Sequence, residues 1–226
     1  MKASKRYLEA LKLVDKDKIY SPQEAIEILK SMPPTKFDQI LEFSCKLNVD
    51  PRQSDQMVRG SVVLPHGTGK KVKVLVFCEP EKEKEAKETG ADFAGGQELI
   101  DKISKESWLD FDYCISTPSM MRFVSKIGKI LGPRGLMPST KIGTVTENIS
   151  AAIKEVKKGK VNFRMDKFGC IHVGLGKISF SKEALLENLK AFIEVLKSLK
   201  PQAVKGEFIK SGYLSTTMNP SLKIAL

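Results

Sequence analysis

Metal ligands and paired cysteines are scarce in this sequence of 226 residues. Its two histidines, His66 and His172, have no second candidate ligand at metal-binding spacing, which argues against a zinc site. Its four cysteines form no CxxC pair, and each lies in an apolar, strand-like stretch that is typical of a buried free thiol. They are Cys45, Cys78, Cys114 and Cys170. We therefore expect a reduced, cytoplasmic protein without metal or cofactor.

Long apolar runs are also missing. No stretch of about 18 apolar residues occurs in the chain, which excludes a membrane-spanning helix. The opening stretch, MKASKRYLEALKLV, carries charges within its apolar part, so we expect neither a secretory signal nor a transit peptide. The GxSxG motif of serine hydrolases does not occur, although the sequence alone leaves a Ser-His-Asp triad open.

Positive charge is plentiful. The formal net charge is +11 and the isoelectric point is near 9.4, which favours a polyanionic partner, a nucleic acid or an acidic membrane surface, over a small neutral substrate. The alternative is a basic protein that is merely soluble. Residues 1–66 and 161–226 together carry a net charge of +7, and residues 67–160 carry +4. These values are similar per residue, so charge does not identify the binding domain.

The first 66 residues predict two helices and two strands. We expect a basic helix over residues 4–14. The stretch SPQE at residues 21–24 predicts the start of a second helix, with a capping serine, a proline at the first helical position and a glutamate that completes a capping box. Strict alternation of apolar and polar residues over 41–49 predicts a strand with one solvated face, and RGSVVLP predicts a second strand.

The rest of the chain changes pattern twice. From Lys70 to about Lys158, short apolar runs alternate with helical stretches, which is typical of a parallel sheet covered by helices. The charged run EPEKEKEAKE indicates a solvated helix face rather than an acidic site. Past Gly159, two strands around the turn DKFG, a helix over 181–199 and strands over 206–214 and 222–226 are expected. We therefore predict an outer domain formed by residues 1–66 and 161–226, and an inserted domain formed by residues 67–160.

The stretch HGTGKK at residues 66–71 raises the question of a phosphate site. A P-loop needs an earlier glycine, a hydroxyl after the lysine and a following helix, and none of the three is present. The dinucleotide fingerprint GxGxxG fails because Val72 takes the place of its third glycine. We interpret Gly67 and Gly69, with Gly159 at the return crossing, as a hinge between the domains.

Five motifs in order resemble the ribosomal protein L-one family of the bacterial large subunit. They are RGSVVLPHGTGK, GKILGPRGLMP, KIGTV, GKVNFRMDKFGCIHVGLGK and STTMNPS, and the resemblance runs from about Lys5 to Ile224. It implies an α/β fold (α+β) with two domains: an outer α/β sandwich that binds large-subunit rRNA, and an inserted Rossmann-like, three-layer α/β domain without a nucleotide. It also implies a non-enzymatic protein, monomeric when free, that forms the mobile side stalk.

The same resemblance implies further RNA partners. Family members assist the release of deacylated tRNA from the exit site, and they typically repress translation by binding the leader of their own mRNA. The competing functions are a nucleotide-dependent enzyme that uses the inserted domain, and a basic protein-interaction module without RNA. The sequence contains no convincing phosphate loop to favour the enzyme, and no amphipathic or heptad surface to favour the interaction module.

The resemblance also implies which residues contact RNA. They are Lys36, Phe37, Arg164, Asp166, Lys167, Ser211, Thr216, Thr217, Met218 and Asn219. The basic members suit phosphates, the hydroxyls suit ribose, and Phe37 and Met218 supply apolar area. For Asp166 we expect a bond from a 2'-hydroxyl or base amine, or a contact with a basic side chain. Without the resemblance, Phe37 would be read as core, Lys36 as a solvated charge and the threonines as ordinary strand-end hydroxyls.

The resemblance also leads to expectations for two further positions, Asn219 and Arg134. Asn219 stands where the family usually has glycine, so the closeness of an RNA contact there is in question. Asparagine tolerates a positive φ better than most residues, but Pro220 favours an extended conformation for the residue before it. In GPRGLMP we expect a rigid loop, in which Arg134 either reaches a phosphate or, as we favour, fixes the loop.

Overall fold

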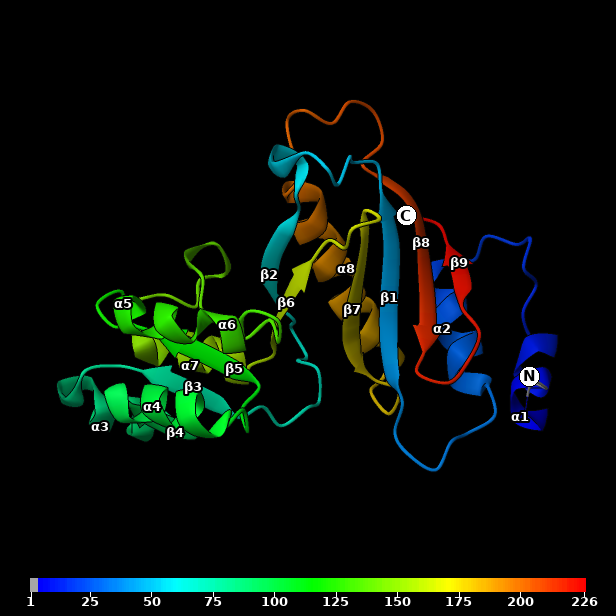
Figure 1. The fold of residues 1–226 in the computed structure, drawn as a ribbon. Coiled ribbons are helices and arrows are strands. Elements are labelled where there is room, and N and C mark those ends of the chain that lie inside the picture. Colours follow the sequence, from blue (N-terminus) through cyan, green and yellow to red (C-terminus); the bar gives the residue numbers. More distant parts are fainter. Residues whose placement is uncertain (1–3) are drawn as a thin grey trace. The chain divides into compact units, whose positions relative to one another are not determined.

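The computed structural model describes residues 4–226 and contains two compact units (Figure 1). The outer unit runs to Gly69 and resumes with Val161–Leu226, and the inserted unit is Lys70–Lys160. Helices and strands occur in both units, so the predicted α/β fold class is confirmed. The assignment of RNA binding to the outer unit stays a prediction at this stage.

The outer unit is built on a four-stranded antiparallel sheet with the strand order β7-β1-β8-β9. The strands are β1 (Ile40–Leu47), β7 (Cys170–Lys177), β8 (Ile209–Thr216) and β9 (Leu222–Ile224). A separate two-stranded sheet pairs β2 (Arg59–Val63) with β6 (Lys160–Arg164). The other elements are helices α1 (Lys5–Lys12), α2 (Pro22–Ser31) and α8 (Lys182–Ser198), and the 3-10 turn η1 (Ser54–Gln56).

Helices α2 and α8 cover one face of the four-stranded sheet, and both begin where the sequence predicts. The hydroxyl of Ser21 accepts the amide of Glu24, and Ser181 caps α8 in the same way. Phe192 of α8 is fully buried, and its ring packs edge-on against Phe43 at 5.7 Å and against Phe163 at 5.1 Å between centroids. The opposite face of the sheet carries no helix in Figure 1. Side chains along β1 accordingly alternate between half-buried and buried, as predicted.

The inserted unit has a parallel sheet of order β4-β3-β5 with helices on both faces. Its strands are β3 (Val74–Phe77), β4 (Phe93–Gly95) and β5 (Tyr113–Ser116). Its α-helices are α3 (Pro80–Glu88), α4 (Gln97–Glu106), α5 (Met121–Val124), α6 (Gly128–Leu131) and α7 (Ile149–Lys157), and its 3-10 turns are η2 (Ser125–Ile127) and η3 (Thr140–Ile142). Alternate residues of β3 enter two separate apolar clusters, one against α3 and α7 and one against α4, α5 and α6. The unit therefore has three layers.

Several predicted boundaries were wrong. The strand expected from Gly206 begins at Ile209, because Gly206 has a φ of 76°, and it extends to Thr216, which pairs with Leu41. The strand predicted to reach Val49 ends at Leu47. Cys170 is half-buried, because it lies at the start of β7 on the open face, whereas the other three cysteines are buried.

Candidate nucleic-acid interface

The turn between β8 and β9, residues 215–221, is fixed to the residues that precede β1. Gln39 is buried, and its side-chain oxygen accepts the hydroxyl of Thr216 and the amide of Met218, both at 3.1 Å. The amide of Ile40 donates to the hydroxyl of Thr217 at 3.1 Å. Thr217 and Met218 remain exposed, and Met218 is 51% exposed. The turn thus presents a hydroxyl and an apolar side chain on a rigid support.

Asn219 does not adopt a positive φ. Among residues 4–226, Ser107 is the one non-glycine residue with a positive φ, so Asn219 does not use the left-handed tolerance that we considered. Its amide donates to the Thr216 carbonyl at 3.1 Å and closes the turn. Its side chain donates to the Thr216 hydroxyl at 2.8 Å and accepts from Arg6 at 2.6 Å. The asparagine side chain is therefore held against the protein.

The predicted residues Lys36 and Phe37 lie at the same end of the sheet, in the loop before β1. Phe37 is 52% exposed, so the alternative interpretation as a core residue is wrong. The hydroxyl of Thr35 donates to the Phe37 carbonyl at 2.6 Å and holds the loop. Both predicted residues line a hollow that also includes Gln39. Phe37 is thus free to pack on an external partner.

Asp166 shapes the turn between β6 and β7. One carboxylate oxygen accepts the amides of Phe168 and Cys170 at 2.8 and 2.7 Å. The pKa of Asp166 is lowered below its usual value, chiefly by the hydrogen bond from the Cys170 amide. The bond from the Phe168 amide and the electrostatic influence of His172 and Lys46 lower it further. We expected this carboxylate to meet a 2'-hydroxyl or base amine, or a basic side chain. Its hydrogen bonds in the structure are to backbone amides, and Nε2 of His172 lies 3.9 Å from its other oxygen. The turn keeps Lys167 exposed and leaves Phe168 75% exposed.

The predicted residues form two groups rather than one pocket. Thr216 pairs with Leu41 at the start of β1, whereas Ser211 and Cys170 pair with Lys46 near its end. β1 is eight residues long, so its two ends lie about 23 Å apart at the usual rise per residue. Figure 1 shows the β8–β9 turn and the β6–β7 turn at opposite ends of the sheet. The open face of β7, β1 and β8 connects them.

Polar side chains occupy that open face. The Ser44 hydroxyl lies 2.9 Å from Nδ1 of His172, and Tyr213 pairs with Ser44 from the other side. Nε2 of His172 lies 3.9 Å from a carboxylate oxygen of Asp166, which is too long for a hydrogen bond. Ser44, His172 and Asp166 therefore lack the bond that would orient a catalytic imidazole. A flat polar surface bounded by two exposed turns suits contact with an extended polar partner.

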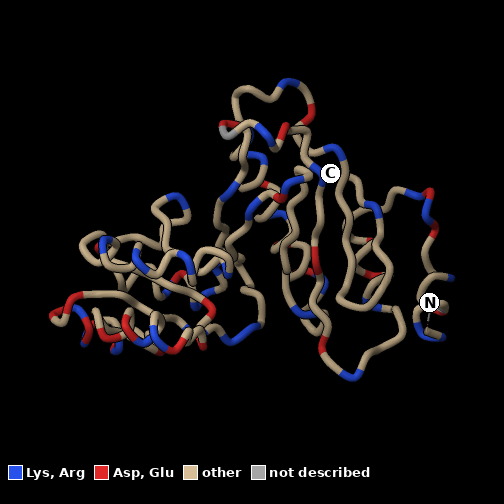
Figure 2. Tube along the Cα trace, viewed as in Figure 1, with Lys and Arg blue, Asp and Glu red and all other residues tan. Residues whose placement is uncertain are grey.

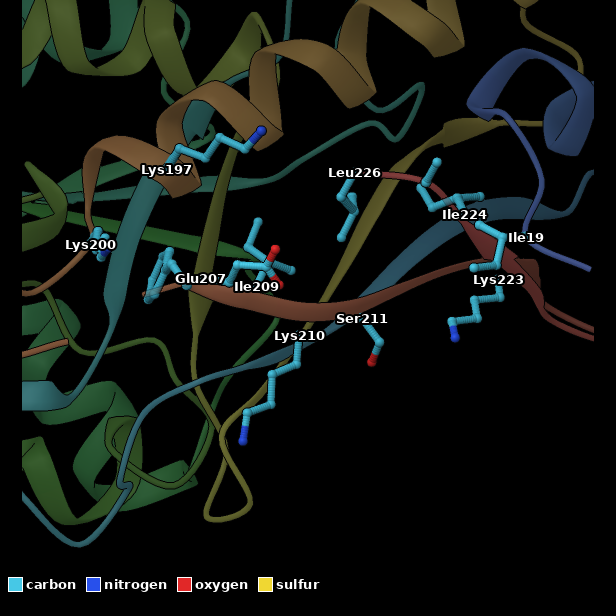
Figure 3. Close-up of a pocket in the computed structure, with 12 residues that line it drawn as sticks. Ile19, Lys197, Lys200, Glu207, Ile209, Lys210, Ser211, Lys223, Ile224 and Leu226 are labelled. Carbon is cyan, nitrogen blue, oxygen red and sulfur yellow. The ribbon is translucent and has the colours of Figure 1, made fainter. Parts of the chain in front are cut away.

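Ser211 borders a hollow of about 550 Å³ that carries several lysines (Figure 3). Its lining residues include Lys197, Lys200, Lys210 and Lys223. Figure 3 shows Lys210 and Lys223 projecting to the same side of their strands as Ser211. Lys200 donates to the Gly206 carbonyl at 2.7 Å, whereas the other three have no carboxylate within 4.0 Å among residues 4–226. Figure 2 shows further basic residues at both ends of the four-stranded sheet.

Positive φ values occur at the three predicted hinge glycines. Gly67, Gly69 and Gly159 have φ values of 65°, 71° and 106°. Gly159 follows α7, and its amide donates to the Val156 carbonyl at 3.1 Å, so its conformation ends that helix. Motion about these glycines stays a prediction. The chain enters β3 after HGTGKK rather than a helix, as expected for a stretch that is not a phosphate loop.

The described part of the chain holds neither a group of three or more His, Cys, Asp or Glu side chains that could hold a metal ion, nor a helix long and apolar enough to span a membrane. Two residues of the interface went unnoticed in the sequence. Gln39 lies just outside the KF pair, and Arg6 reaches the turn from 213 positions away. The sequence carries no local signal for the Arg6 contact, because helical periodicity says nothing about so distant a partner.

Comparison with known proteins gives a consistent picture. A sequence model described as the ribosomal protein L1p/L10e family matches residues 29–220. A protein of Persephonella marina is 54% identical over 226 residues, covering 99% of this chain and 93% of its own length. Proteins of Thermosipho africanus and Fervidobacterium nodosum are each 53% identical. The matches cover 99% and 100% of this chain, respectively, and 96% of the length of each relative. All three are described as large ribosomal subunit protein uL1.

Proposed function

The chain belongs to the ribosomal protein L1p/L10e family, and from this premise we propose that it binds large-subunit rRNA through the open face of its outer unit. As in its relatives, its place is the large ribosomal subunit in the cytoplasm. The observation that supports the proposal is the rigid, exposed Thr217–Met218 turn at one end of a solvated sheet face. Lys36 and Phe37 flank this turn, and Arg164, Lys167 and Ser211 continue the surface at the other end.

The chemistry of this surface suits RNA. The lysines and Arg164 supply a salt-dependent attraction to phosphates. The hydroxyls of Thr217 and Ser211 exchange hydrogen bonds with ribose 2'-hydroxyls, which DNA lacks. The exposed Phe37 and Met218 pack on sugar or base. Asp166 contributes by shaping its turn.

Finer parts of the function follow from the same surface. We propose that the rRNA complex forms the side stalk and assists release of deacylated tRNA from the exit site. We also propose that the leader of the protein's own mRNA binds the same face, so that rRNA and mRNA compete. The protein then acts as a translational repressor, without enzymatic activity or a cofactor. A leader fragment that fails to compete with rRNA would remove the repressor part alone.

Titration of a stalk-region rRNA fragment tests the RNA site. The variants are Thr217→Val, which removes the hydroxyl, Thr217→Ser, which keeps it, and Thr140→Val, a matched control in the inserted unit. We expect the valine variant at position 217 to bind about ten-fold more weakly at both of two salt concentrations, since a lost hydrogen bond costs about 1 kcal/mol or more. The serine and the control should bind almost normally. Equal binding by all four proteins would reject this site.

A chain that joins residue 66 directly to residue 161 tests whether the outer unit alone carries the RNA site. We expect it to fold and to bind the rRNA fragment almost as tightly as the intact protein, because the outer unit has its own apolar core. An unfolded product would show that the outer unit is not autonomous. A folded product without RNA binding would move part of the site to the inserted unit.

A further inference from the structure

Arg6, in the first turns of α1, joins that helix to the β8–β9 turn. Its guanidinium donates to the side-chain oxygen of Asn219 and to the carbonyl of Met218, each at 2.6 Å. Two donors of one planar group thus hold Met218 and Asn219, two consecutive residues of the exposed turn. No carboxylate lies within 4.0 Å of Arg6 among residues 4–226, so the turn is its hydrogen-bonding partner in the free protein.

The contact continues into the interior as a chain of hydrogen bonds. The side-chain nitrogen of Asn219 donates to the Thr216 hydroxyl at 2.8 Å. That hydroxyl donates to the side-chain oxygen of Gln39 at 3.1 Å, which also accepts the Met218 amide at 3.1 Å. Thr216 and Gln39 are buried, so these bonds are shielded from water. A surface helix is thereby connected to the base of β1 through the turn.

Asn219 supplies both side-chain links of this chain of hydrogen bonds. Glycine at this position would have no side-chain acceptor for Arg6 and no donor for Thr216. With glycine, Arg6 would retain the Met218 carbonyl alone. With asparagine, both ends of the side-chain amide are satisfied by the protein, which keeps the side chain away from a partner approaching Thr217 and Met218.

We propose that Arg6 and Asn219 are positioning residues for RNA recognition. They hold Thr217 and Met218 in the binding conformation, and Asn219 acts by bonding to Arg6 rather than to RNA. The proposal rests on the proposed RNA-binding function, and it adds α1 to the elements that hold the RNA-binding turn in place. The competing explanation is that Arg6 binds an RNA phosphate directly and leaves the turn when RNA arrives.

A double-mutant cycle distinguishes the two explanations. Affinity for the stalk rRNA fragment is measured for the intact protein, Arg6→Gln, Asn219→Gly and the double variant. Because two charge-assisted bonds are removed, we expect Arg6→Gln to weaken binding about ten-fold in the Asn219 background. In the glycine background, where one of the two bonds is already missing, the loss should be about three-fold or less. An equal loss in both backgrounds, or no loss in either, would overturn the proposal.

Salt dependence and Arg6→Lys supply the second readout. Removing a side chain that binds a phosphate directly lowers the slope of log affinity against log salt by about 0.7 to 0.9, whereas removing a positioning side chain leaves the slope unchanged. Lysine keeps the charge but not the planar fork, so we expect Arg6→Lys to resemble Arg6→Gln. Full rescue by lysine together with a reduced slope for glutamine would assign Arg6 to a phosphate instead.

Hydrogen exchange without RNA separates this proposal from the proposed function. In the free protein, the Met218 and Asn219 amides are bonded within the turn. We expect both to exchange faster in Arg6→Gln than in the intact protein, because the two bonds from the guanidinium to the turn are lost. Unchanged exchange would overturn the coupling even if RNA binds. Accelerated exchange in a protein that does not bind rRNA would keep the coupling and reject the RNA function.

Discussion

The two sheets of this protein differ in what they leave exposed. Along β1 of the outer unit, buried and half-buried residues alternate, and helices cover one face. All four residues of β3 in the inserted unit are buried, because helices cover both faces of that sheet. One chain thus builds a sheet with a free polar face and a sheet without one. An extended partner can lie flat on the outer sheet, whereas the inserted unit offers it loops and helix surfaces.

The largest effect should come from removing a core side chain on the covered side of the outer sheet. Phe192 is fully buried between Phe43 and Phe163, so Phe192→Ala should destabilise the outer unit by about 3–5 kcal/mol and abolish RNA binding on mild heating. Ile153→Ala, in α7, should destabilise the inserted unit by about 2–5 kcal/mol and leave RNA binding intact.

The chain's one tryptophan makes this measurable. Trp108 packs against Phe93 and Phe111, so its fluorescence reports on the inserted unit, while hydrogen exchange reports on the outer one. Phe192→Ala should shift exchange without shifting the fluorescence transition, and Ile153→Ala should do the reverse. Both probes shifting together in either variant would show that the two units unfold as one.

A smaller loss is expected at the buried amide of Asn188 in α8. Its side chain donates to the carbonyls of Gly67 and Leu175 at 3.0 and 2.7 Å, and accepts the His66 amide at 3.0 Å. Asn188→Ala leaves these three groups without a partner, so we expect the outer unit to lose about 2–4 kcal/mol. The fluorescence transition of the inserted unit should not move.

Asn162 is the matched control for that substitution. Its side-chain oxygen is buried without a hydrogen-bond partner, so Asn162→Ala should cost less than about 1 kcal/mol. Urea unfolding followed by hydrogen exchange measures both variants. Equal losses at the two positions would mean that truncation, rather than the hydrogen bonds of Asn188, causes the effect.

The sequence predicted local features and missed distant contacts. The alternation of β1, the cap at Ser21 and the start of the helix at residue 181 were predicted correctly, because each depends on residues within a few positions. The Arg6–Asn219 bond joins residues 213 positions apart, and no periodicity contains it. Phe37 illustrates a third case: its type suggested core, while its place before β1 leaves it exposed.

For the candidate site, the sequence supplied residues but not their arrangement, and their contact with RNA stays a prediction. The resemblance supplied the residue types of the interface, but their division between the two ends of β1 comes from the sheet register. Asp166 shows the limit most clearly. Its role in bonding two amides of its own turn depends on the backbone path from Phe168 to Cys170, which residue types do not reveal.

The lysines around the Ser211 hollow allow the electrostatic contributions of the two units to RNA binding to be compared. Lys197→Gln, Lys210→Gln and Lys223→Gln combined should weaken rRNA binding and lower its salt slope, by about 0.7 to 0.9 for each phosphate that is no longer neutralised. A control that combines Lys84→Gln, Lys105→Gln and Lys129→Gln in the inserted unit removes the same charge. Titrations at several salt concentrations should show a change for the first set alone. Equal changes would mean that net charge, rather than the lysines around the hollow, attracts the RNA.

The smallest expected effect concerns pH. The pKa of Asp166 is lowered in the folded protein, chiefly by the Cys170 amide and then by the Phe168 amide. A group whose pKa falls on folding stabilises the fold at pH values above its unfolded pKa, and the stabilisation disappears as the pH falls through the folded value. The outer unit should therefore lose stability below about pH 4. In Asp166→Asn this part of the acid sensitivity should be gone.

Urea unfolding at pH 7 and pH 3 measures the contribution of Asp166. The difference between the two pH values should be smaller in Asp166→Asn than in the intact protein when hydrogen exchange follows the outer unit. Trp108 fluorescence should show the same pH dependence in both proteins, because Asp166 lies outside the inserted unit. If the variant and the intact protein gave identical pH profiles in the outer unit, the two amide bonds would not stabilise the ionised carboxylate. The β6–β7 turn would then be held by other contacts, among them the bond from Lys46 to the Phe168 carbonyl.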